Sequence, residues 1–126
     1  MKKNLLIIIL LWLSIPIISW GSDSFYILVV PKHRVADDVV VVELYANYEN
    51  STNPVMEGSG SFEIFYPDGR STGLKENLFF NKKTGHWQAK PVNASTLDHG
   101  EYYCRARIED QNGEKVSRRE YFFIIR

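Results

Sequence analysis

Cysteine is scarce in this sequence. Cys104 is the only one among 126 residues, so no disulfide can form within the chain and packing must stabilise the fold. Cys104 lies in an apolar strand pattern, and nothing in the local sequence would lower the pKa of its thiol. We therefore expect a buried apolar side chain instead of a catalytic thiol. A disulfide between two chains is the alternative.

Net charge is also absent. The 15 basic and 15 acidic residues cancel to a formal net charge of +0. Such a chain has no general attraction to nucleic acid or to anionic lipid. We therefore do not expect a nucleic-acid partner.

The sequence lacks any sustained helical periodicity. Segments rich in valine, isoleucine and aromatic residues recur instead, between clusters of Gly, Pro, Asn and Asp. This pattern is typical of an all-β protein. A Pro-Asp-Gly turn at 67–69 predicts a return strand after it. The other predicted strands are 25–30, 39–48, 61–66, 86–90, 101–110 and 115–125. About seven strands without a crossover helix predict a single antiparallel β-sandwich.

The N-terminus has the order of a secretory signal peptide. Lys2 and Lys3 precede an apolar run at 5–13, and the small residues Ser19 and Gly21 follow it. We predict a signal peptide at 1–21 and one domain at 22–126, which lacks the two lysines and so carries 13 basic against 15 acidic residues. A retained membrane anchor is the alternative. Either interpretation places the domain outside the cytoplasm: secreted, periplasmic or at the cell surface.

The segment 97–106 reads Leu-Asp-His-Gly-Glu-Tyr-Tyr-Cys-Arg-Ala. It resembles the Asp-x-Gly-x-Tyr-x-Cys-x-Ala signature of immunoglobulin-like domains. The resemblance implies a structural corner formed by Asp98, Gly100, Tyr102 and Cys104, in which the Tyr102 hydroxyl binds a backbone group near 96–98. The sequence has no partner cysteine and no tryptophan in the predicted strand 61–66. It therefore resembles the broad superfamily, as a disulfide-free exported domain, and such domains bind or adhere.

Two arginines lie two positions apart on the strand that follows this corner. Arg105 and Arg107 share one side of it, and a two-residue turn at Asn112-Gly113 would place Arg118 opposite Arg107. The possible binding face comprises Tyr103, Arg105, Arg107, Arg118 and Phe122. The alternative is a solvated sheet face. A one-residue bulge at the turn would bring the other side of the last strand to this face.

The candidates for chemistry are few. His33, His86 and His99 form no recognised ligand motif, and we expect each of them in a loop or on an exposed face. No Ser-His-Asp set or carboxylate pair stands out. We therefore assign no catalytic, cofactor-binding or metal-binding residue, no cofactor and no enzymatic activity.

Three functional hypotheses follow from these observations. The leading one is an exported, non-enzymatic immunoglobulin-like binding or adhesion module whose partner is an unidentified protein or glycan. The second is a structural subunit that assembles through an exposed strand edge. The third is a periplasmic metal-binding or enzymatic protein. A membrane is a partner only if the N-terminal segment is retained.

Overall fold

The computed structural model describes residues 24–50 and 53–126. The signal peptide predicted for 1–21 lies outside the described residues. Across the described ranges the regular structure is strand only, and no helix there is long and apolar enough to cross a membrane. The all-β prediction is confirmed. The strands are β1 (Phe25–Arg34), β2 (Val39–Tyr48), β3 (Gly58–Phe65), β4 (Ser71–Asn81), β5 (His86–Gln88), β6 (Val92–Asn93), β7 (Gly100–Asp110) and β8 (Lys115–Ile124).

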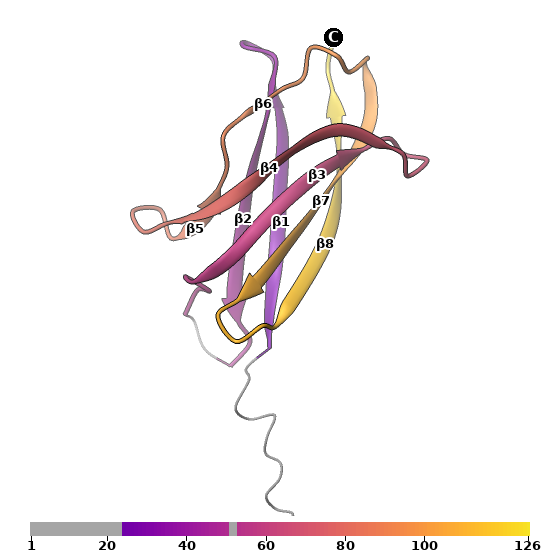
Figure 1. The fold of residues 1–126 in the computed structure, drawn as a ribbon. Helices are drawn as coiled ribbons and strands as arrows, with labels where there is room; N and C mark the ends of the chain where they lie inside the picture. The colour runs from indigo at the N-terminus through magenta and orange to yellow at the C-terminus, as the bar shows by residue number, and fades with distance from the viewer. Residues whose placement is uncertain (1–23, 51–52) are drawn as a thin grey trace, which may run out of the picture.

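All strand pairs are antiparallel, and the order is β1-β2-β5-β4-β3-β7-β8, with β6 on β2. In Figure 1 strands β3, β4 and β7 cross in front of β1 and β2. Strand β4 joins the two layers, because it pairs with β3 over most of its length and with β5 at Phe79–Asn81. The edge strands β1 and β8 are joined by hydrogen bonds from side chain to backbone. Arg118 Nη1 on β8 donates to Ile27 O at 3.5 Å, and Ile125 N, just after β8, donates to His33 Nδ1 at 3.0 Å.

Proline does not end the first strand. We predicted a strand over 25–30 that stops before Pro31, but β1 continues to Arg34 and Pro31 pairs with Val42. An edge strand tolerates proline, because the missing N–H is not needed on the open side.

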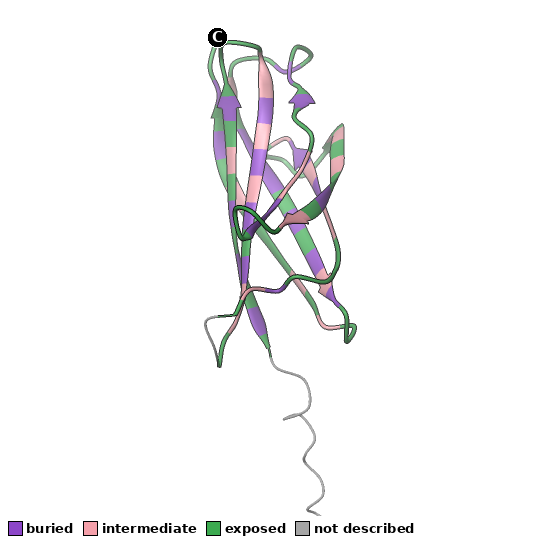
Figure 2. Cartoon of the chain, turned by 90° about the vertical axis from the view of Figure 1, so that its left-hand side faces the viewer, coloured by how far each residue is buried: buried purple, intermediate pink, exposed green. Residues whose placement is uncertain are grey.

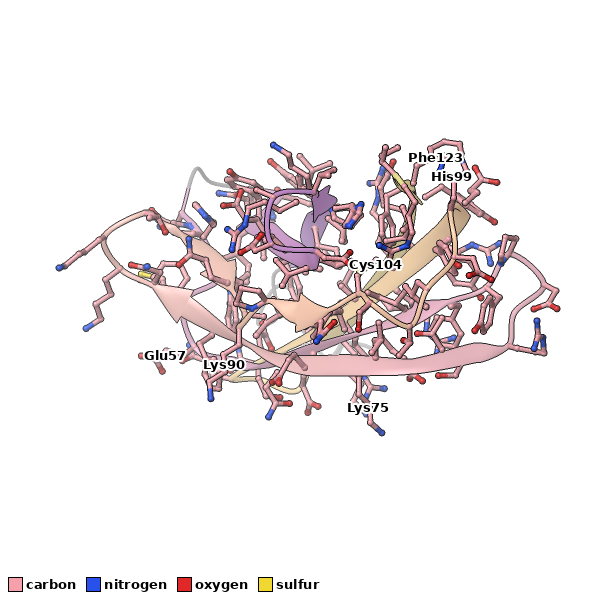
Figure 3. All side chains as sticks on the ribbon, turned by 90° about the horizontal axis from the view of Figure 1, so that it is seen from above. Glu57, Lys75, Lys90, His99, Cys104 and Phe123 are labelled. Carbon is pink, nitrogen blue, oxygen red and sulfur yellow. The ribbon has the colours of Figure 1, made fainter. Side chains whose placement is uncertain are left out.

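The core lies between the two layers. Buried and exposed residues alternate along the strands, as the stripes in Figure 2 show. Cys104 is fully buried in this core, and Figure 3 places it between the layers. Burial raises the pKa of its thiol to about 12. Cys104 is thus an apolar core residue, as we expected, and its thiol is inert at neutral pH.

The predicted corner is present at the start of β7. The Tyr102 hydroxyl donates to Asp98 O at 2.9 Å, within the interval we predicted. Gly100 has a φ of +149°, which a residue with a side chain rarely adopts. This bend allows the chain to enter β7 with Tyr102 and Cys104 facing the core. The local sequence therefore dictates the corner.

The β7–β8 turn differs from the prediction. Gly113 N donates to Asp110 O at 3.1 Å, and Asp110 N donates to Glu114 O at 2.9 Å, so the loop has three residues, 111–113. Gly113 alone in this loop has a positive φ, of +85°. The Asp110 carboxylate also accepts from the N–H groups of Asn112 and Glu114, both at 2.9 Å. The two-residue turn at Asn112-Gly113 was therefore wrong by one residue.

Candidate functional site

Two of the three histidines are buried, which corrects the expectation of loops and exposed faces. His33 is 8% exposed and His86 is 9% exposed. At His33 both ring nitrogens have partners. Its Nδ1 accepts from Ile125 N, so the ring proton is on Nε2, which donates to Asp38 Oδ1 at 2.8 Å. His33 therefore has no lone pair to offer a metal in its neutral form.

His86, at the start of β5, has a different hydrogen-bonding pattern. Lys83 N donates to Asn81 Oδ1 at 2.9 Å, which fixes the orientation of that amide. Asn81 Nδ2 then donates to Gln88 Oε1 at 2.8 Å, which leaves the Gln88 NH₂ group 3.1 Å from His86 Nε2. An amide NH₂ can only donate, so the Nε2 of neutral His86 carries a lone pair and Nδ1 carries the proton.

A carboxylate lies beside this lone pair. Glu43 Oε2 on β2 is 3.5 Å from His86 Nε2, and the Tyr45 ring packs at 4.7 Å from the imidazole. The strand register explains the arrangement, because Glu43 pairs with Gln88 across β2 and β5. Two electron-pair donors thus lie close together. A metal ion that displaced the Gln88 NH₂ group could bind to both.

The third histidine stands apart. His99 is exposed, and its Nδ1 accepts from Arg126 N at 3.2 Å. Within residues 24–50 and 53–126, no three side chains of His, Cys, Asp or Glu form a group that could hold a metal ion. The pair His86 and Glu43 offers two donors, and a metal ion there would need water for its remaining ligands.

The predicted binding face is divided by the shifted turn. Tyr103, Arg105 and Arg107 share the outer side of β7. Arg118 lies opposite Ala106 and donates to Ile27 O, while Phe122 is 7% exposed and packs near Tyr102. The residues of β8 that join the outer face are instead Ser117, Arg119 and Tyr121, opposite Arg107, Arg105 and Tyr103.

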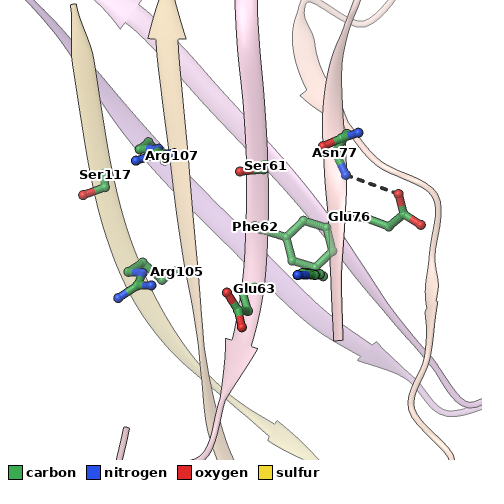
Figure 4. Close-up of a pocket in the computed structure, with 9 residues that line it drawn as sticks. Ser61, Phe62, Glu63, Glu76, Asn77, Arg105, Arg107 and Ser117 are labelled. Carbon is green, nitrogen blue, oxygen red and sulfur yellow. Dashed lines mark hydrogen bonds between the residues drawn. The ribbon is translucent and has the colours of Figure 1, made fainter. Parts of the chain in front are cut away.

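Aromatic rings support the arginines of this face. Phe65 and Tyr103 stack with their centroids 5.1 Å apart and their planes 13° apart. The Arg105 guanidinium lies over Phe65 at 4.5 Å, and that of Arg119 lies over Tyr103 at 5.1 Å. Beside them lies an open hollow of about 570 Å³, shown in Figure 4. The sequence alternation indicated Arg105 and Arg107, but it missed Arg119 and Phe65, which come from β8 and β3.

Comparison with known proteins identifies a fold and no family. No protein-family model matches the chain, and no curated protein matches it. Among solved structures, the chain is similar to the crystal structure of CopC from Methylosinus trichosporium OB3b. The TM-score is 0.53 at 15% sequence identity, and the match covers 81% of this chain and 94% of that chain. Similarity at this identity shows the fold, and the immunoglobulin-like resemblance is compatible with it as a coarse description.

This comparison corrects the functional prediction. The leading hypothesis, a non-enzymatic immunoglobulin-like binding or adhesion module, is contradicted by the similarity to CopC, which fits the third hypothesis of a metal-binding protein. The similarity is also compatible with the predicted periplasmic location. Secretion and cell-surface location remain predictions.

Proposed function

We propose that this protein is a periplasmic metal-binding protein that holds a copper or zinc ion between His86 and Glu43. The observation that carries the proposal is the 3.5 Å separation of His86 Nε2 from Glu43 Oε2, with a lone pair on the nitrogen. Zinc binds imidazole nitrogen and carboxylate oxygen at about 2.0–2.2 Å, so two such ligands at a tetrahedral angle stand about 3.4 Å apart. The observed spacing therefore suits a shared ion.

The surroundings of the pair favour binding in one orientation. The Tyr45 ring packs against the imidazole, and the Nδ1 of His86 retains its proton, so Nε2 is the nitrogen that faces the ion. Glu43 is 40% exposed at its side chain, against 11% for His86. An ion can therefore reach the pair from the Glu43 side.

Gln88 competes with the ion for His86. Its NH₂ group donates to the same Nε2 lone pair, so it must move away when an ion binds. With two protein ligands and one competing hydrogen bond, the site would exchange its ion readily. This behaviour suits a protein that takes up and delivers a metal better than one that requires a permanent structural ion.

The test is a titration of the purified protein with Cu²⁺ and Zn²⁺, followed by calorimetry and by melting temperature. We expect saturable binding of one ion and a rise in melting temperature, because a ligand of the native state stabilises it. His86→Ala should abolish both effects and Glu43→Gln should weaken them, whereas Gln88→Glu should tighten binding by adding a third donor. His99→Ala, which removes an exposed histidine, is the matched control. Binding that survives His86→Ala, or no binding at all, would refute the proposal.

A further inference from the structure

A second candidate site lies on the outer face of β4, β3, β7 and β8. None of its residues pairs with His86 in the strand register. Two rows of side chains cross these strands. One row holds Lys75, Glu63, Arg105 and Arg119, and the neighbouring row holds Asn77, Ser61, Arg107 and Ser117. Figure 3 shows Lys75 pointing away from the core, and Figure 4 shows Arg105 and Arg107 along one wall of the hollow. Together the rows contain four cations and one carboxylate, and Glu76 adds a second carboxylate to the lining of the hollow.

Two of these cations face each other. Arg105 and Arg119 are direct partners in the β7–β8 register, and like charges at such positions are destabilising. None of the salt bridges in the described part of the chain involves Arg105, Arg107, Arg119 or Lys75. The Glu63 carboxylate instead accepts a hydrogen bond from the Ser71 hydroxyl. Glu63, opposite Arg105 on β3, offsets part of the repulsion between Arg105 and Arg119, and a bound anion would relieve the rest.

The two guanidinium groups are also held in place before any ligand arrives. Arg105 lies over Phe65 and Arg119 lies over Tyr103, and these two rings stack on each other. Phe65 and Tyr103 are only 7% and 5% exposed although they belong to the outer face. A guanidinium over a ring keeps its N–H donors free at its edge, where they can bind an oxyanion in a bidentate manner. Preorganisation of this kind reduces the entropy lost on binding.

We propose that this face binds an anionic polysaccharide through its sulfate or carboxylate groups. Arg105 and Arg107 are two residues apart on one strand, so their positions are separated by about 6.6 Å, and a ligand with repeated oxyanions can occupy both. The hydroxyl groups of Ser61 and Ser117 line the same hollow and can bind sugar hydroxyls. Tyr121, 45% exposed beside Tyr103, offers a ring for a sugar to stack on.

The test measures binding of a heparin tetrasaccharide by calorimetry at two salt concentrations. We expect saturable binding that weakens with salt, with no binding of maltotetraose, a neutral sugar of equal length. Inorganic sulfate at the same sulfate concentration should bind far more weakly. If sulfate matched the tetrasaccharide, the site would be a simple oxyanion site and the polysaccharide proposal would be wrong.

Arg119→Glu gives a diagnostic pair of effects. It should weaken tetrasaccharide binding about tenfold or more, because a charged hydrogen bond is lost. It should also raise the melting temperature of the free protein, because the introduced carboxylate would face Arg105 with the opposite charge. Lys82→Glu at the exposed β4–β5 turn is the control, with the same change in net charge. Equal weakening by both variants would reduce the interaction to net charge alone and would overturn the site. His86→Ala should leave saccharide binding unchanged, which keeps this test separate from that of the metal proposal.

Discussion

His33 and His86 are both buried beside a carboxylate, yet their surroundings differ. At His33, in the region where β1, β2 and the C-terminal residues meet, each ring nitrogen has a partner of matching polarity. At His86, at the start of β5, the Nε2 lone pair accepts a hydrogen bond from the Gln88 NH₂ group and lies 3.5 Å from the Glu43 carboxylate. The first arrangement stabilises the fold by itself. In the second arrangement an ion could replace the Gln88 hydrogen bond, and we propose that this difference separates a structural histidine from a metal ligand.

The arginines show the same contrast. Arg126 donates through Nε to Leu97 O at 2.7 Å, through Nη1 to Asp38 Oδ2 at 2.8 Å and through Nη2 to Ala94 O at 2.5 Å. It therefore ties the C-terminus to the β1–β2 turn and to the segment before β7. Arg105 and Arg119 rest on aromatic rings, and neither takes part in a salt bridge with a described residue. Arg126 therefore serves the fold, whereas Arg105 and Arg119 are the arginines that we propose bind an anion.

The largest expected effect separates the two histidines. His33→Ala should lower the free energy of unfolding by about 3 kcal/mol, because the Ile125 N–H loses its acceptor and a buried side chain is removed. His86→Ala should cost less, about 2 kcal/mol in the absence of metal, because it also removes a buried side chain but leaves no backbone N–H without its acceptor. Urea denaturation of both variants, with His99→Ala as the exposed control, measures the difference. Equal losses for His33 and His86 would remove the contrast.

A smaller effect is expected at the corner. Tyr102→Phe should cost about 1 kcal/mol, because it removes the hydroxyl that donates to Asp98 O and leaves the packing of the ring intact. The same denaturation experiment measures this loss, and Tyr121→Phe on the exposed face is the matched control with no expected change. A loss no greater than that of the control would show that the corner bond does not stabilise the fold.

The smallest expected effect is a loss of stability at low pH. Hydrogen bonds from Arg126 and then from His33 hold the pKa of Asp38 below its usual 3.8. A lowered pKa in the folded state gives stability that is present above the unfolded pKa and is lost as the pH falls through the folded value. Wild type should therefore exceed Asp38→Asn in stability at about pH 6, and the gap should narrow towards about pH 2.5. A gap that stays constant over this range would show that the charge of Asp38 is not responsible.

The sequence predicted the features that depend on residues close together in the chain. The corner at Tyr102 was predictable because its glycine, hydroxyl and acceptor lie within five positions of the chain. The turn after β7 was not, because the Asp110 carboxylate binds two N–H groups of the loop and selects three residues instead of two. This shift of one residue in the turn places Arg119 instead of Arg118 on the outer face.

Long-range contacts explain the remaining differences. The burial of His33 depends on Ile125, 92 positions away, and the lone pair of His86 matters because β2 places Glu43 beside it. No local pattern around either histidine encodes these partners. Burial of the thiol, by contrast, followed from strand alternation alone.

Cys104 is the single thiol of the chain, and it is enclosed between the two layers. A thiol-reactive dye attacks the thiolate, which burial suppresses, so labelling requires the sandwich to open first. When reclosing is faster than labelling, the rate of dye incorporation in native buffer reports the population of the open form, without denaturant and without an engineered probe. The single cysteine, which has no partner for a disulfide within the chain, therefore reports on the opening of the fold.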